Sequence, residues 1–170
     1  MTNTFQSCQP SAMTRAEFVG AFGAVYEHSA WVAVRAYDAG ITAIHDGPTE
    51  LHRVMADVLL SASIDEQLAV IRAHPSLGDR VAVALTASSL AEQAGAGLQD
   101  CSPQEFARFQ ELNAAYVAKF GFPFIMAVKG SGRLAILKAF ETRIHHDRDV
   151  ETHAALLEIN KIALFRLAEL

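Results

Sequence analysis

Residues 63–75 read SIDEQLAVIRAHP, and this stretch decides the fold because it holds both the start and the end of a helix. Ser63 followed by Glu66 is a capping box, in which a hydroxyl and a carboxylate satisfy free N–H groups of the first helical turn. Pro75 cannot continue a helix and disfavours the helical conformation in the residue before it. The stretch therefore predicts a short helix that stops at His74.

The same start signal recurs elsewhere in the chain. Thr14–Glu17 and Ser102–Glu105 are capping boxes, and apolar residues follow both at helical spacing. Gly121 is placed to end the second of these helices, because glycine accepts a left-handed turn. Asp149 is the expected N-cap of the last helix. Further helices are predicted over about 29–37, 49–60, 131–145 and 150–168.

Two irregular segments, 74–88 and 121–130, interrupt this helical pattern. GFPFIMAV, residues 121–128, has the character of a buried extended segment with no evident partner strand, so a ligand, other backbone or water must satisfy its polar groups. The sequence predicts an all-α, single-domain helical bundle over residues 1–170, with residues 1–13 as a flexible N-terminus. Sites in such a domain tend to lie on its irregular segments.

Composition excludes several classes of function. The net charge is −5 and there is no basic run, which argues against nucleic-acid binding. No uncharged apolar run reaches the about 18 residues that a membrane span needs. The two cysteines, Cys8 and Cys101, form no disulfide framework and fit a reducing compartment. A cytoplasmic protein that binds neither nucleic acid nor membrane is predicted.

The candidate chemistry begins with His74. A histidine at a helix end can simply favour the C-terminal dipole. It can equally act as a general acid or hydrogen-bond donor, because histidine titrates near neutral pH. In SSLAEQAGAG, residues 88–97, the choice is between another capping box and a cradle for a planar small molecule, built from Ser89, Glu92 and Gln93. Spacing alone leaves both choices open.

Metal and carboxylate sites have weaker signals. His145, His146 and His153 lie close in the sequence, but no HExxH or CxxC spacing is present, so no metal site is predicted. Arginine would matter if the substrate carries a carboxylate. Arg133, Arg143 and Arg166 lie in or near the C-terminal helices, although surface solvation is the commoner role of an arginine.

Four segments together resemble the family of 2-oxo-4-hydroxy-4-carboxy-5-ureidoimidazoline (OHCU) decarboxylases. They are HPSLGDR (74–80), LTASSLAEQAGAGL (85–98), LNAAYVAKFGFPFIMAVKG (112–130) and EINKIALFRLAEL (158–170). The resemblance covers nearly the whole chain from about Thr14. It implies an all-helical fold and decarboxylation of OHCU to (S)-allantoin, the last step of urate breakdown to allantoin. It also implies that the enzyme uses no cofactor and is often a homodimer.

The resemblance also implies roles for individual residues. The histidine of its His-Pro motif, assigned to catalysis, falls on His74, with Pro75 beside it. Arg166 is a candidate for the substrate carboxylate or for supporting the site. One departure is Ser76, where the family usually has an acidic residue. The remaining implied substrate-binding residues are Ser89, Leu90, Ala91, Glu92, Gln93, Phe124, Ile125, Met126, Ala127 and Val128.

Three other classes of function stay open at this point. A non-catalytic helical module would bind a purine-derived ureido metabolite without turning it over. A structural helical protein would dimerise through its C-terminal helices and gain no stability from the ligand. Metal-assisted hydrolysis would require ligand spacing that the sequence lacks.

Overall fold

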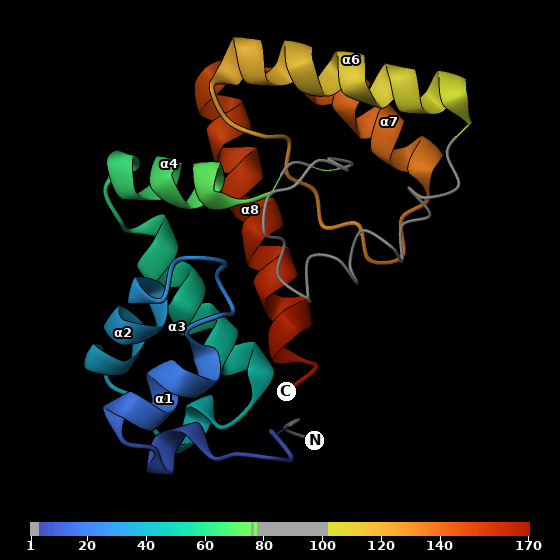
Figure 1. The fold of residues 1–170 in the computed structure, drawn as a ribbon. Coiled ribbons are helices and arrows are strands. Elements are labelled where there is room, and N and C mark those ends of the chain that lie inside the picture. The colour runs from blue at the N-terminus through green and yellow to red at the C-terminus, as the bar shows by residue number, and fades with distance from the viewer. Residues whose placement is uncertain (1–3, 76, 78–101) are drawn as a thin grey trace. The chain divides into compact units, whose positions relative to one another are not determined.

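The computed structural model describes residues 4–75, 77 and 102–170, and Figure 1 shows their arrangement into helices. No strand occurs among them, which confirms the all-α prediction for this part of the chain. Chain contacts divide the protein into two compact units. The first comprises residues 1–70 and 159–170, and the second residues 71–158. Each unit is described below by itself.

The first unit is built around three helices. Its core consists of side chains with no exposed surface on α1, α2 and α3, among them Phe22, Val32 and Leu51. Helix α2 packs against both α1 and α3. The elements that lie in this unit or begin in it are η1 (Pro10–Ala12), α1 (Arg15–Phe22), α2 (Trp31–Asp38), η2 (Ala43–His45), α3 (Pro48–Leu60) and α4 (Ile64–Ala73).

The second unit is organised around an aromatic core. Helix α6 (Pro103–Phe120) lies beside α7 (Arg133–Arg143), and α8 (Arg148–Leu167) begins in this unit (Figure 1). The rings of Phe124 and Phe140 stack with their centroids 3.7 Å apart, and Tyr116 meets Phe124 edge-on at 5.3 Å. Aromatic residues therefore join the predicted extended segment to α6 and α7.

The predicted helix starts depend on local chemistry, and the structure confirms three of them. At α6, the Ser102 hydroxyl accepts from the Glu105 N–H at 3.2 Å, and the Glu105 carboxylate accepts from the Ser102 N–H at 2.8 Å. Thr14–Glu17 and Ser63–Glu66 make the same reciprocal pair. Gly121 ends α6 with φ of 76°, a conformation that favours glycine.

The prediction that Asp149 is the N-cap of the last helix is wrong. Helix α8 begins at Arg148, and the Glu151 N–H donates to the Asp147 carbonyl at 2.9 Å, which makes Asp147 the capping position. The helix therefore begins two residues earlier than predicted, directly after Asp147. Asp149 lies in the first turn, where its negative charge still favours the helix dipole.

Residues 4–13, for which the sequence predicts a flexible N-terminus, make specific contacts in the structure. They include η1, and Pro10 is buried. The Asp46 carboxylate accepts from both the N–H and the hydroxyl of Ser11, each at 2.8 Å. A distant aspartate thus holds this segment, which no local pattern could indicate. Among the described residues, no helix is long and apolar enough to cross a membrane.

Candidate functional site

His74 follows directly after α4, as the proline behind it predicts. Its N–H donates to the Ile71 carbonyl at 3.2 Å, which tightens the last turn of the helix. The residue is only 8% exposed, so the imidazole is enclosed by protein at the end of an element and does not lie on a solvated helix flank. Pro75 is half-buried beside it.

Two side-chain bonds connect the His-Pro break to its surroundings in the second unit. The Arg72 guanidinium donates to the Gly121 carbonyl at 3.4 Å, so the end of α4 lies against the start of the apolar segment. The Asn113 amide, on α6, donates to the Leu77 carbonyl at 2.9 Å. The structure therefore places the His-Pro break beside α6 and the start of the apolar segment.

The apolar segment 122–128 is non-helical, as predicted, and side chains satisfy part of its backbone. The Ile125 carbonyl accepts from Arg143 Nη1 at 2.7 Å, and the Ala127 N–H donates to Glu158 Oε2 at 2.8 Å. Phe124, Ile125 and Val128 are buried, whereas Met126 and Ala127 are half-buried. Among the described residues, the N–H of Met126 has no acceptor.

A buried network of charged side chains, centred on Glu151, bonds to this segment through Arg143. Glu151 has no exposed surface, and its carboxylate accepts from Arg143 at 2.5 and 2.9 Å, from His146 Nδ1 at 2.8 Å and from the Tyr116 hydroxyl. Burial, together with the hydrogen bond to Glu151, raises the pKa of Tyr116. The phenol therefore stays protonated and remains a donor.

Sequence reasoning missed Glu151, because nothing in its local pattern distinguishes it from the other acidic residues of a first helical turn. Arg143 and His146 were considered only for a substrate carboxylate and for a metal. In the structure both bond to Glu151. Among the described residues, no group of three histidine, cysteine or carboxylate side chains is arranged to hold a metal ion.

Arg166 lies in the first unit and is only 7% exposed. Its guanidinium donates to the Val25 carbonyl at 3.2 Å and to Glu27 Oε2 at 3.3 Å. Glu27 is itself buried. A buried, charge-paired arginine differs from the surface arginine that composition alone favours, since a buried charge needs partners.

The remaining candidates are not placed. Ser76 and the stretch from Ser89 to Gln93 lie outside the described residues, so the choice between a capping box and a ligand cradle there stays open.

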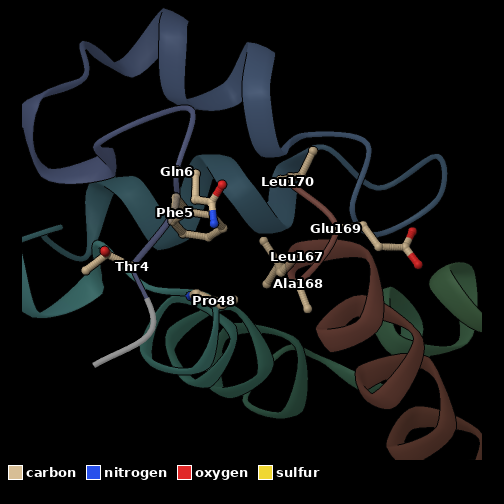
Figure 2. Close-up of a pocket in the computed structure, with 8 residues that line it drawn as sticks. All are labelled: Thr4, Phe5, Gln6, Pro48, Leu167, Ala168, Glu169 and Leu170. Carbon is tan, nitrogen blue, oxygen red and sulfur yellow. The ribbon is translucent and has the colours of Figure 1, made fainter. Parts of the chain in front are cut away.

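Figure 2 shows a pocket of about 270 Å³ in the first unit. None of the predicted site residues lines it. Its lining residues are Thr4, Phe5, Gln6, Pro48, Leu167, Ala168, Glu169 and Leu170.

Comparison with known proteins gives one consistent result. The sequence model of the family described as OHCU decarboxylase matches residues 11–168. A 2-oxo-4-hydroxy-4-carboxy-5-ureidoimidazoline decarboxylase of Halalkalicoccus jeotgali is 46% identical over 153 residues, which cover 90% of this chain and 84% of that protein. The uric acid degradation bifunctional protein PucL of Bacillus subtilis is 38% identical over 148 residues, covering 87% of this chain and 29% of that protein.

Solved structures agree with the sequence relatives on the fold. A crystal structure of (S)-allantoin synthase has a TM-score of 0.74 at 29% identity and covers 94% of this chain, which spans 52% of that longer chain. A crystal structure of OHCU decarboxylase in the presence of (S)-allantoin has a TM-score of 0.68 at 24% identity, covering 84% of this chain and 91% of that chain. The second likeness concerns the fold alone.

Proposed function

This chain belongs to the OHCU decarboxylase family, and from that premise we propose that it converts OHCU to (S)-allantoin and carbon dioxide. The reaction is the last step of urate breakdown to allantoin and makes the protein a carbon-carbon lyase. The observation that carries the proposal is His74: the chain encloses an imidazole at a helix break, in the motif that the family resemblance assigns to catalysis.

The chemistry needs no cofactor, because the substrate contains its own electron sink. The C–C bond to the carboxylate breaks, and its electron pair moves toward the neighbouring C=N of the ring while carbon dioxide leaves. The ring nitrogen then takes up a proton, and the hydroxyl beside the broken bond gives up its proton to become a ring carbonyl. A proton also adds to the carbon that bears the ureido group, and this carbon becomes the stereocentre of allantoin. The protein must therefore orient the carboxylate, expose one face of the ring and control one proton.

His74 is the proposed proton-handling residue. Its imidazole would hydrogen-bond the hydroxyl or the carboxylate beside the bond that breaks, and would help to move the proton. Histidine suits this role because its ordinary pKa lies near neutral pH, and a placed acid–base group accelerates a reaction by roughly 10²–10⁴-fold. Enclosure by protein keeps bulk water from competing for the proton.

Substrate binding is proposed for the other family positions. Glu92 would accept N–H groups of the ureido arm or ring, because a carboxylate repels the substrate's own carboxylate. Gln93 can donate and accept. Backbone groups of 124–128 would bind the remaining edge, and Arg166 would support the site. We also propose that the protein is a homodimer and that it is cytoplasmic. Light scattering of the purified chain tests the oligomeric state.

The test replaces His74 with asparagine, which keeps hydrogen-bonding capacity but cannot carry a proton at neutral pH. We expect kcat to fall by about 10²–10⁴-fold, with a wild-type circular dichroism spectrum in the far ultraviolet. His153→Asn is the matched control, because His153 is exposed on α8. Full activity in His74→Asn would mean that His74 has only a structural role. Binding of OHCU without turnover by the wild type would favour the non-catalytic binding module.

A further inference from the structure

We propose that Arg143 and Glu158 are positioning residues that hold the backbone of segment 124–128 in the orientation that presents Met126 to the substrate. The inference rests on the proposed function of that segment. Both side chains bond to backbone atoms of the segment. Arg143 lies on α7 and Glu158 on α8. Neither residue is among those given a role in the proposed chemistry.

The first contact is rigid because Arg143 is itself held. Its Nε and Nη2 donate to one carboxylate oxygen of Glu151, and its Nη1 donates to the Ile125 carbonyl at 2.7 Å. The guanidinium carbon also lies 4.5 Å from the centre of the Phe124 ring. A planar fork that is bonded on two sides and stacked on a third has little freedom to move.

Glu151 is held in turn by Tyr116 and His146. The Tyr116 hydroxyl comes from α6 and donates to the same oxygen as Arg143, while His146 Nδ1 bonds to the other oxygen at 2.8 Å. All of the carboxylate is buried. A buried carboxylate is tolerated only with such partners, so the network has one arrangement.

The bond from the Ala127 N–H to Glu158, together with the Ile125 bond, determines which backbone groups of the segment stay available to a ligand. In an extended chain, successive residues direct their N–H and C=O groups to opposite sides, so alternate residues direct them to the same side. Ile125 and Ala127 are alternate residues, and both bond to side chains of α7 and α8. The N–H and C=O of Met126 consequently point to the other side, where no described residue accepts from its N–H. A ligand rich in amide groups, such as the ureido arm and ring of the substrate, matches this N–H and C=O pair.

The decisive variant is Arg143→Lys, because lysine keeps the charge but cannot bond to Glu151 and the Ile125 carbonyl with one planar fork. Arg108→Lys is the matched control. Arg108 also bonds to two carboxylates in the second unit, but these pairs are exposed and do not touch the segment. Glu158→Met removes the acceptor of the Ala127 N–H, and it is the test variant if Arg143→Lys does not fold.

The measurements are KM, kcat and the handedness of allantoin, with enzyme concentrated enough for the catalysed flux to exceed spontaneous decay. We expect kcat/KM to fall by about 10²-fold with a rise in KM, since small misplacements have effects of this size, and the excess of one enantiomer to drop. Arg108→Lys should match the wild type. Wild-type KM and handedness in folded Arg143→Lys and Glu158→Met would overturn the inference.

Hydrogen exchange separates failure of this inference from failure of the proposed function. Without substrate, the peptide covering 122–128 should exchange several-fold faster in Arg143→Lys than in the wild type and Arg108→Lys. An inactive wild type with this difference would sink the decarboxylase proposal but keep the positioning of the segment. An active wild type with equal exchange in all three proteins would support the decarboxylase proposal but overturn the positioning role of Arg143.

Discussion

At the scale of single residues, the Tyr116 hydroxyl shows how a buried charge is stabilised. It donates to the Glu151 carboxylate, whereas the equally buried Tyr26 hydroxyl donates to a neutral acceptor, Asn160 Oδ1, at 2.6 Å. Burial raises the pKa of both phenols. Hydrogen bonds to charged groups contribute more to stability than bonds between neutral groups.

We therefore expect Tyr116→Phe to lower the free energy of unfolding by about 1.5–3 kcal/mol, and Tyr26→Phe by about 0.5–1.5 kcal/mol. Urea denaturation at pH 7 measures both. The comparison is matched because each change removes one hydroxyl from a ring with at most 1% exposure. An equal or smaller loss for Tyr116→Phe would contradict the account of the Glu151 network.

The same residues explain what the sequence could and could not predict about the site. His74 could be singled out as a candidate because a proline beside a helical pattern is a local signal. Glu151 was missed because its partners Tyr116, Arg143 and His146 come from α6, α7 and the turn after α7, and only folding brings them together. Arg166 was predicted as a supporting residue, but its buried pairing with Glu27 depends on residues 139 positions apart.

At the scale of elements, helix starts were predictable wherever a capping box was complete. Ser102 and Glu105 satisfy each other's N–H groups. The bonds that Ser102 and Arg133 donate to the Glu105 carboxylate lower its pKa. The start of α8 was misplaced because two aspartates compete two residues apart. The contacts of residues 4–13 could not be predicted, because Asp46 bonds to them from a distant part of the sequence.

Ser102→Ala should lower the free energy of unfolding by about 1 kcal/mol, because one N–H at the start of α6 loses its acceptor. Ser102→Asp should restore most of this loss, since aspartate is an equally good N-cap and its charge suits the helix dipole. Chemical denaturation of the three proteins measures the series. A loss that Ser102→Asp does not recover would mean that the cap is not what stabilises this helix start.

At the scale of the whole molecule, the titration of His52 makes stability depend on pH. Its Nε2 lies 2.7 Å from the Asn160 carbonyl within the first unit. Burial lowers the pKa of His52, and it outweighs the opposing effects of that carbonyl and of Asp57. The unfolded state therefore binds a proton at higher pH than the folded state, so stability falls as pH drops below about 6.5.

We expect wild-type stability to decrease between about pH 6.5 and 4.5, and His52→Gln to reduce this slope. The range ends near pH 4.5, the ordinary pKa of glutamate, because carboxylates begin to contribute to acid unfolding below it. Glu66 is one of them, since its bond to Arg35 lowers its pKa to about 2. Thermal midpoints across this range measure the slope. The exposed His153→Gln is the control, and an unchanged slope in His52→Gln would contradict the assignment.

The family match covers residues 11–168, which is nearly the whole chain. The central claim is that the protein makes (S)-allantoin from OHCU. The most direct test generates OHCU in place from urate with the two preceding enzyme activities and follows circular dichroism after this protein is added. We expect rapid formation of one enantiomer by the wild type and its loss in folded His74→Asn. Racemic product appearing at the spontaneous rate with the wild type would contradict it.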